Sequence, residues 1–307
     1  KSLTLDSLKS KGVSGKIPAD SIQAVTVPGA VAGWDAMNAR FGTLPLSEDL
    51  TPAIYYASEG VPITELVSKV WAHSSRAFLG KPGFAKTFLI SGHAPVTGEI
   101  FRNPDLATSL RVIAEHGSDG FYRGPLAATL VDFLTEQGSL IRADDIAEYQ
   151  PEWVQPISTT YRGWSVYELP PNGQGIAALS MLNIMEQFPL GEYGHNSAKA
   201  LHVMIEAKKL AYADLIKYVG DPRFSKIPVD QLLSKDLAKK RARLINANHA
   251  ACHVLPSDLA ERLSAMGRDT TYLTVIDREG NIVSLIQSNF NAFGTGFVAP
   301  GTGFVLH

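Results

Sequence analysis

The chain has 307 residues, 45% hydrophobic and 19% charged, so it holds enough apolar material for a sizeable core and lacks the composition of a disordered protein. Its 28 lysines and arginines nearly balance its 30 aspartates and glutamates, which excludes the broad basic surface that a nucleic-acid partner would need. The single cysteine, Cys252, excludes an internal disulfide and a thiolate zinc cluster.

Neither a signal peptide nor a membrane span is recognisable in the sequence. The opening residues, Lys1 to Asp6, lack the apolar run of a signal peptide. The longest apolar segment, around Ile176 to Met185, is interrupted by Ser180 and Asn183 and predicts a buried helix rather than a membrane span. We therefore expect a soluble protein, and the sequence leaves open whether it is cytoplasmic, periplasmic or secreted.

Helix signals recur through the first 220 residues. A helix is expected from Pro104, because Asn103 offers a cap and proline suits the first helical position, and Gly117 predicts its end. Further helices are expected at about Ala30 to Phe41, Pro125 to Glu136, Ile176 to Phe188 and Ser197 to Val219.

Strands are expected in two hairpins with short turns. The strands are Ile157 to Tyr161 and Trp164 to Leu169 around Arg162-Gly163, then Thr271 to Asp277 and Asn281 to Ser288 around Arg278-Glu279-Gly280. Apolar residues fall on both faces of these strands, which predicts a sheet covered on both sides within a layered body.

One short sequence is repeated near the end of the chain. Gly294-Thr295-Gly296-Phe297-Val298 returns as Gly301-Thr302-Gly303-Phe304-Val305. The spacing does not match the dinucleotide-binding pattern and no helix follows, so we interpret the repeat as paired strand ends whose glycines need positive φ.

Three charged features favour structural roles over sites. The basic run Lys235 to Arg243 has apolar residues at helical spacing, which favours a solvated helix face over a polyanion site. Glu206 and Asp214 lie eight residues apart on one predicted helix, roughly 12 Å along its axis, and are expected to be solvated or salt-bridged. The eight histidines, His202 among them, show no spacing typical of a metal site.

A series of motifs along nearly the whole chain resembles one enzyme family. In order, they are Val25-Thr26-Val27-Pro28-Gly29-Ala30-Val31-Ala32-Gly33, Phe101-Arg102-Asn103-Pro104, Phe121-Tyr122-Arg123-Gly124, Tyr161-Arg162-Gly163, Leu169-Pro170-Pro171, Tyr212-Ala213-Asp214, Gly220-Asp221-Pro222, Thr270 through Asp277, Gly280-Asn281 and Phe293-Gly294-Thr295-Gly296. Each motif is modest, but their order is highly specific. The chain resembles the γ-glutamyltransferase (γ-glutamyltranspeptidase) family of N-terminal-nucleophile hydrolases.

The resemblance implies that Thr270 is the nucleophile. Family precursors cut their own backbone before a threonine, which here makes Asp269-Thr270 the processing site. Cleavage would give Thr270 a free amine with a reference pKa near 7.7 to 8.0, so nucleophile and general base would share one residue. The implied substrates are glutathione and other γ-glutamyl amides, with transfer through an acyl-threonine to water or an amine. Ser288 aligns with a family hydroxyl residue that helps to position the nucleophile.

One position departs from the family pattern. Where family members with strong γ-glutamyl specificity have a substrate-binding asparagine, this chain has Phe290 between Asn289 and Asn291. Either these two asparagines take over substrate binding or the acyl pocket accepts a less polar group. The segment Leu169 to Gly175 also resembles the branch with cephalosporin-acylase-like members.

The resemblance also implies the fold and the chain organisation. The implied fold is α+β, a four-layer αββα sandwich, helix-rich in its first two thirds and with the central sheet starting near the end. Residues 1–269 would be part of the large subunit and residues 270–307 the start of the small subunit, both from one precursor and one domain. We expect a chain that is truncated at both ends. On its own it should be inactive, because the residues that form the family's oxyanion hole would follow His307, and one oxyanion donor is worth about 10²-fold or more in rate.

The leading hypothesis is a self-processing γ-glutamyl amidohydrolase and acyltransferase with no cofactor or metal. Its expected partners are a small-molecule amide and the two subunits, without nucleic acid. A catalytically silent homologue that binds amino-acid or peptide ligands, and a glutaryl or cephalosporin acylase, remain as alternatives.

Overall fold

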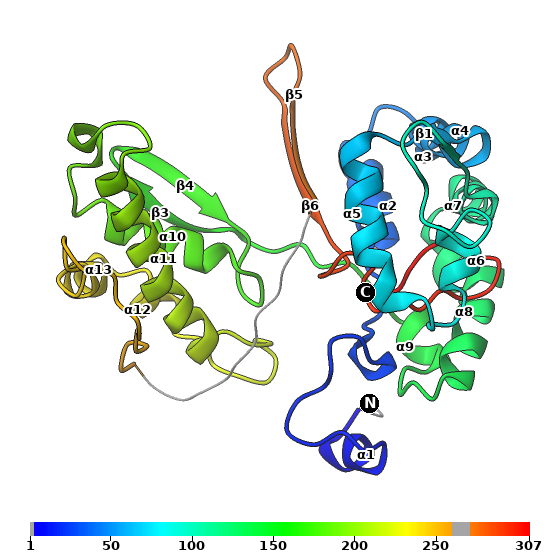
Figure 1. Cartoon of the computed structure of the whole chain (residues 1–307), viewed down its shortest axis with the longest axis horizontal. Coiled ribbons are helices and arrows are strands. Elements are labelled where there is room, and N and C mark those ends of the chain that lie inside the picture. Colours follow the sequence, from blue (N-terminus) through cyan, green and yellow to red (C-terminus); the bar gives the residue numbers. More distant parts are fainter. Residues whose placement is uncertain (1–2, 260–270) are drawn as a thin grey trace. The chain divides into compact units, whose positions relative to one another are not determined.

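The computed structural model describes residues 3–259 and 271–307 and shows a mixture of helices and strands (Figure 1). This confirms the expected α+β class. The chain divides into two compact units: unit 1 comprises Lys1–Pro151 with Gly267–His307, and unit 2 comprises Glu152–Met266. Within the described ranges, every helix is too short or too polar to cross a membrane.

Unit 1 is built from helices, two short strands and one long hairpin. Its helices are α1 (Leu5–Ser10), α2 (Ala30–Phe41), α3 (Leu46–Asp49), α4 (Thr51–Glu59), α5 (Glu65–Ser75), α6 (Phe84–Phe88), α7 (Pro104–Tyr122), α8 (Pro125–Glu136) and α9 (Ala143–Ala147). Its strands are β1 (Val61–Pro62), β2 (Ile100–Phe101), β5 (Thr271–Ile276) and β6 (Ile282–Gln287), paired antiparallel as β1–β2 and β5–β6.

The expected helices of unit 1 are confirmed. Helices α2 and α8 have the predicted bounds, and Asn103 caps α7 by accepting the Leu106 N–H at 3.0 Å. Gly117 interrupts α7 with φ 59°, but the chain returns to helical geometry and continues to Tyr122. One core cluster joins α2, α7, α8 and α9 to the last eleven residues of the chain.

The hairpin β5–β6 forms as predicted, but its faces are open. Asp277 closes the turn by accepting the Asn281 backbone N–H at 2.8 Å, and Gly280 takes φ 84°. All of β5 and nearly all of β6 are exposed, including Tyr272, Ile276 and Ile282. The described residues of this chain therefore do not supply the cover that we predicted for both faces.

The repeated glycine sequence pairs with itself, as predicted. Val298 and Val305 form an antiparallel bridge. The Leu306 N–H donates to the Phe297 carbonyl at 2.9 Å. All four glycines of the two copies have positive φ, between 51° and 78°. The repeat is thus a pair of tight turns in which glycine avoids a steric cost.

Unit 2 packs helices against one hairpin. Its elements are β3 (Ile157–Tyr161), β4 (Trp164–Glu168), α10 (Gly175–Met185), α11 (Ala198–Tyr218), α12 (Val229–Leu232) and α13 (Lys235–Ala242). The β3–β4 turn is the expected two-residue one, with positive φ at both Arg162 and Gly163. The buried faces of α10 and α11 meet in two core clusters.

Helix α10 is the buried helix expected from the interrupted apolar run. Asn183 is 1% exposed, and its polar atoms are satisfied inside the unit. Its Oδ1 accepts from Thr159 Oγ1 and Lys235 Nζ, both at 2.6 Å, and its Nδ2 donates to the Leu233 carbonyl at 2.9 Å. A buried polar residue is tolerated here because it is hydrogen-bonded.

The prediction of a solvated face for the basic run 235–243 is only partly correct. Lys239, Lys240 and Arg243 are exposed. Arg241, however, is 5% exposed and its Nε lies 3.4 Å from Asp214 Oδ2 on α11. The opposite charge on a neighbouring helix makes burial of this arginine tolerable, and sequence spacing within the run gives no sign of it. Asp214 and Glu206, which pairs with Lys209, are thus both salt-bridged, as expected.

Candidate active site

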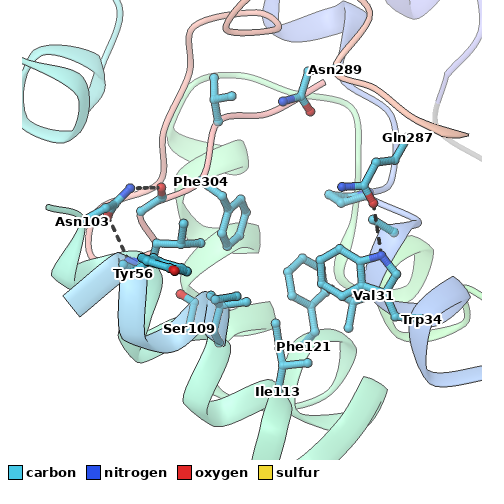
Figure 2. Close-up of a pocket in the computed structure, with 18 of the residues that line it drawn as sticks. Val31, Trp34, Tyr56, Asn103, Ser109, Ile113, Phe121, Gln287, Asn289 and Phe304 are labelled. Atoms are coloured by element: carbon cyan, nitrogen blue, oxygen red, sulfur yellow. Dashed lines mark hydrogen bonds between the residues drawn. The ribbon is translucent and has the colours of Figure 1, made fainter. Parts of the chain in front are cut away.

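Unit 1 contains a cavity of about 650 Å³ where the end of β6 meets α2 and α7. Most of its wall is apolar. Figure 2 shows Val31, Ile113, Phe121 and Phe304 around the cavity, with Asn289 and Gln287 at its edge. A mainly apolar cavity with a few polar groups on one side is the usual form of a small-molecule site.

A buried tyrosine places α2 against this cavity. The N-cap of α2, Gly29, offers no side-chain hydrogen bond, and the Tyr122 hydroxyl instead accepts the Ala32 N–H at 3.3 Å. The same hydroxyl donates to the Pro28 carbonyl at 2.5 Å. Burial raises the pKa of Tyr122 to about 12, so the hydroxyl keeps its proton for this bond. Tyr122 thereby satisfies an orphan N–H of the first turn.

Helix α2 in turn holds the end of β6. Trp34 lies one turn into α2, and its indole Nε1 donates to Gln287 Oε1 at 3.1 Å (Figure 2). Gln287 directly precedes Ser288, so this bond fixes the backbone that carries the expected site residues.

Asn103 joins α7 to the second glycine turn. Its amide nitrogen donates to the Gly303 carbonyl at 2.7 Å, while its oxygen caps α7. Ser109 also donates from α7, to the Thr302 carbonyl at 2.7 Å. A Cβ on Gly303 would lie 2.1 Å from the Leu106 nitrogen, so only glycine allows this approach.

Gly303→Ala is therefore expected to destabilise the protein more than Gly301→Ala. Both residues have φ +73°, but a Cβ on Gly301 meets nothing within 4 Å. Gly301→Ala should lower the free energy of unfolding by about 1 kcal/mol, from backbone strain alone. Gly303→Ala should lower it by at least about 2 kcal/mol more, because the Asn103 cap must also move. Urea unfolding of both variants measures the difference; equal losses would contradict the close approach described here.

An aromatic cluster fixes the chain just beyond the expected site residues. Phe293 has φ 58°, which is unusual for a large side chain. Its ring lies 5.1 Å from both Phe84 and Phe88 and 5.5 Å from Trp71, measured between centroids. These contacts hold Phe293 in place and so determine where the first glycine turn begins.

The expected site residues are distributed as follows. Asp269 and Thr270 lie outside the described residues, and Thr271, the next residue, lines the cavity. Ser288 and Asn289 also line it. Asn291 is not among its lining residues; its carbonyl accepts the Gly294 N–H at 2.8 Å. Of the two asparagines proposed from sequence, Asn289 is thus the one at the cavity.

Phe290 is held beside Ser288 in an unusual conformation. Its φ is 73°, and its N–H donates to Ser288 Oγ at 2.8 Å. Its ring centroid lies 6.2 Å from that of His307. The Ser288 hydroxyl therefore accepts a backbone bond that orients it at the cavity edge.

Several cavity residues were not predicted from the sequence. Trp34, Ile113 and Phe304 lie on segments that were predicted, but no pattern shows that residues so distant along the chain share a cavity. The hydrogen bond of Trp34 alone spans 253 positions. Within the ranges that the structure describes, no group of three or more His, Cys, Asp or Glu side chains is placed to hold a metal ion.

Comparison with known proteins assigns the family. Residues 1–307 match the family model for gamma-glutamyltranspeptidase. The chain is 38% identical over 307 residues to the glutathione hydrolase-like YwrD proenzyme of Bacillus subtilis (strain 168), covering 100% of this chain and 56% of that relative. It is 38% identical over 286 residues to the acylase ACY 1 proenzyme of Pseudomonas sp. (strain SE83), covering 93% and 50%.

The structural comparison agrees. A crystal structure of cephalosporin acylase from Bacillus halodurans superposes with a TM-score of 0.87 at 40% identity, covering 99% of this chain and 55% of that one. This chain spans about half the length of these relatives. The family model matches the whole chain, and a solved structure at 40% identity has a similar fold. The chain therefore belongs to the gamma-glutamyltranspeptidase family.

Proposed function

We propose that this chain is part of a self-processing amidohydrolase that cuts between Asp269 and Thr270 and then uses Thr270 as its nucleophile. The whole-length family match carries the proposal. Two matched relatives are named as proenzymes, which supports processing. The position of Thr271 in the cavity wall, beside Ser288 and Asn289, supports a substrate site next to this bond.

Self-cleavage and turnover use the same hydroxyl. In the precursor, Thr270 Oγ attacks the Asp269 carbonyl carbon, the peptide nitrogen leaves as a protonated amine, and water hydrolyses the ester. In the mature enzyme, Oγ attacks a substrate amide, its proton passes to the Thr270 amine and then to the leaving amine, and an acyl-threonine forms. Water or an acceptor amine attacks this ester and regenerates the hydroxyl.

The organisation follows from this chemistry. Residues 1–269 would form part of the large subunit and residues 270–307 the start of the small one. The finer fold that we propose is the four-layer αββα sandwich, with β5–β6 in its central sheet. The exposed apolar side chains on both faces of β5–β6 support this, because such strands are stable when helices or a second sheet cover them.

A γ-glutamyl amide such as glutathione is the first substrate class. Asn289 lines the cavity and offers an amide that can bind the polar head of such a substrate, and Ser288 is suited to positioning the nucleophile. Asn291, the other proposed substrate-binding residue, would act from outside this wall.

An acylase is a second candidate, favoured by a specific observation. The cavity wall is mostly apolar, and Phe290 occupies the position where the resemblance implies an asparagine. The named acylase relative and the similar cephalosporin acylase structure support a less polar acyl group.

The test of the proposed function uses the full-length precursor. We expect two chains on a denaturing gel and an amino-terminal sequence for the smaller one that begins at Thr270. A chromogenic γ-glutamyl anilide and a glutaryl amide then separate the two candidate activities by their kcat/KM. A precursor that stays a single chain yet hydrolyses either amide would overturn the mechanism.

Phe290→Asn is expected to shift the preference toward the γ-glutamyl anilide by about tenfold in the ratio of the two kcat/KM values. An added amide can bind the polar head, and asparagine adopts the φ of 73° more readily than phenylalanine. Phe290→Leu is the control, because it removes the ring without adding an amide. An equal shift in both variants would contradict a role for the amide.

A further inference from the structure

Aromatic side chains from separate elements of unit 1 converge on the cavity described above. Among the described residues of its wall, the aromatic ones are Trp34 on α2, Tyr56 on α4, Phe88 on α6, Phe101 on β2, Phe121 on α7 and Phe304 in the second glycine turn. Figure 2 shows Trp34, Tyr56, Phe121 and Phe304 around the cavity. An apolar ligand that enters this space therefore meets aromatic rings on several sides.

Rings outside the cavity hold several of these rings in place. Trp71 lies 4.8 Å from Phe101 and 6.2 Å from Phe88, measured between centroids, and its Nε1 donates to the Phe88 carbonyl at 3.0 Å. Tyr122 lies 4.8 Å from Phe121 in an edge-to-face contact. Within the described wall, neither Trp71 nor Tyr122 is a lining residue. The wall is therefore largely preorganised, and a ligand loses little free energy in ordering it.

The cavity has a buried apolar end and an exposed polar edge. Val31, Ile113 and Phe121 are buried in the wall, whereas Ser288 and Asn289 are exposed at the edge. A charged group at the apolar end would lose its hydration, and the described wall offers no opposite charge to it. A neutral ring gains free energy by leaving water and by edge-to-face contacts with the rings of the wall. The buried end therefore favours an aromatic group over a charged one.

The size of the cavity fits an aromatic ring with a short linker. A dry cavity of about 150 Å³ can hold one benzene molecule. This cavity is larger, at about 650 Å³. With the ring at the buried end, the amide carbonyl of such a ligand lies toward the edge, where Thr271, Ser288 and Asn289 line the wall.

We propose that this aromatic cavity binds the acyl group of the substrate and that the preferred acyl donor is an arylacetyl amide. The inference rests on the proposed function, because it names the acyl group of that reaction and favours the acylase candidate. The nucleophilic oxygen forms an ester with the arylacetyl carbonyl carbon as the C–N bond breaks, and the amine leaves with the hydroxyl proton. Water then hydrolyses the ester to an arylacetic acid and regenerates the hydroxyl.

The first test compares acyl groups on one leaving group, with the full-length mature enzyme. The probes are the 4-nitroanilides of phenylacetic acid, of glutaric acid and of the γ-carboxyl group of glutamic acid. The kcat/KM of the phenylacetyl anilide should exceed those of the other two at least about tenfold, because burial of a ring in a hydrophobic pocket is worth at least this factor.

A matched pair of tyrosines on α4 links this preference to the cavity. Tyr55 and Tyr56 are adjacent and similarly exposed, at 59% and 55%, but of the two only Tyr56 lines the cavity. Tyr56→Leu should lower the kcat/KM of the phenylacetyl anilide at least about fourfold through loss of ring contacts, whereas Tyr55→Leu should stay within about twofold of wild type. Both side chains are largely exposed, so both variants should fold.

Binding without turnover gives a second measurement. The probe 2-phenylethanol contains no amide bond, and NMR titration of the mature enzyme should give it a Kd at least about threefold lower than that of 2-cyclohexylethanol, which lacks an aromatic ring. The repeated glycine sequence supplies the variants, because Phe304 lines the cavity and Phe297, at the equivalent position of the first copy, does not. Phe304→Leu should raise the Kd of 2-phenylethanol at least about fourfold, and Phe297→Leu should leave it within about twofold of wild type.

Two results would overturn the inference and leave the proposed function intact. One is a processed enzyme that prefers the γ-glutamyl or the glutaryl anilide to the phenylacetyl anilide. The other is an unchanged kcat/KM and Kd in Tyr56→Leu and Phe304→Leu, which would show that another part of the full-length chain fills the cavity. A wild-type precursor that stays uncut would instead overturn the proposed function, and its titration with 2-phenylethanol would still support or contradict the aromatic site.

Discussion

Thr270→Ala in the full-length precursor is expected to give one uncut chain with no measurable amidase activity. The substitution removes the hydroxyl that attacks the Asp269 carbonyl, so no new amino terminus forms. Without that terminus there is neither nucleophile nor general base, and loss of both groups should lower kcat by at least about 10³-fold to 10⁴-fold. A denaturing gel and turnover of the γ-glutamyl anilide and the glutaryl amide measure the two effects.

Two control variants make this result specific. Thr270→Ser keeps a hydroxyl, so this precursor should still be cut to a measurable extent, but more slowly than the wild-type precursor. Thr274→Val removes a threonine hydroxyl from β5, where it donates to Tyr272 Oη at 2.8 Å outside the cavity wall, and should cleave normally. If Thr270→Ala still produced two chains, the processing site would lie elsewhere.

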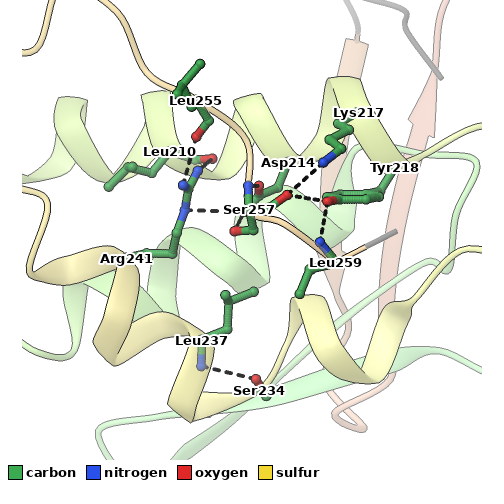
Figure 3. A network of polar contacts seen from close by, with 10 residues as sticks. All are labelled: Leu210, Asp214, Lys217, Tyr218, Ser234, Leu237, Arg241, Leu255, Ser257 and Leu259. Atoms are coloured by element: carbon green, nitrogen blue, oxygen red, sulfur yellow. Dashed lines mark hydrogen bonds and ion pairs between the residues drawn. The ribbon is translucent and has the colours of Figure 1, made fainter. Parts of the chain in front are cut away.

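Arg241→Met is expected to lower the free energy of unfolding by about 3–5 kcal/mol. The variant leaves the Asp214 carboxylate buried without its cation, and one-sided removal of a buried ion pair has a cost of this size. It also removes the bonds to the Leu255 and Leu210 carbonyls (Figure 3). Arg243→Met, on an exposed residue of the same basic run, should change the free energy by less than about 0.5 kcal/mol.

The pH dependence of stability tests whether the unpaired Asp214 carboxylate causes the loss in Arg241→Met. Burial raises the pKa of Asp214 above its usual range, opposed by the Ser257 N–H and by the Arg241 charge. Without Arg241, the pKa rises further, so the folded state binds a proton more readily than the unfolded state. Stability of Arg241→Met, relative to wild type, should therefore fall as pH rises from about 4 toward 7. Urea unfolding at several pH values tests this. Asp214→Asn added to Arg241→Met should remove most of this pH dependence, and a loss independent of pH would contradict the explanation.

Local sequence signals were sufficient for most helices and hairpins. Helix α2 and the β3–β4 turn lie where the sequence placed them, because caps, prolines and glycines act on their immediate neighbours. Gly117 was predicted to end α7, but it only interrupts the helix, which resumes beyond it and continues to Tyr122. Its later turns bury Phe121 and Tyr122 in the core of unit 1, and this packing outweighs the local break.

The candidate site was predictable only in part. Ser288 was proposed from its resemblance to a family position and Asn289 because it flanks Phe290, and the structure places both in the wall of one cavity. The contacts that hold the cavity wall in place were not predicted. Tyr122 caps α2 from a helix ninety positions away, and Gly303 approaches Asn103 across two hundred positions. These contacts depend on shape and on distance in space, neither of which appears as a periodic pattern.

By itself, the sequence determined the class of the protein, its family resemblance and the threonine on which the proposed chemistry depends, because these rest on the order of motifs along the chain. Only the tertiary structure decided that Arg241 is buried against Asp214 rather than solvated, and that the acids and lysines of α11 hold the backbone of residues 251 and 257. The physical reason is that a charged side chain has the same local pattern whether it meets water or a buried partner. What separates the two cases is the desolvation and pairing that arise when distant segments pack together.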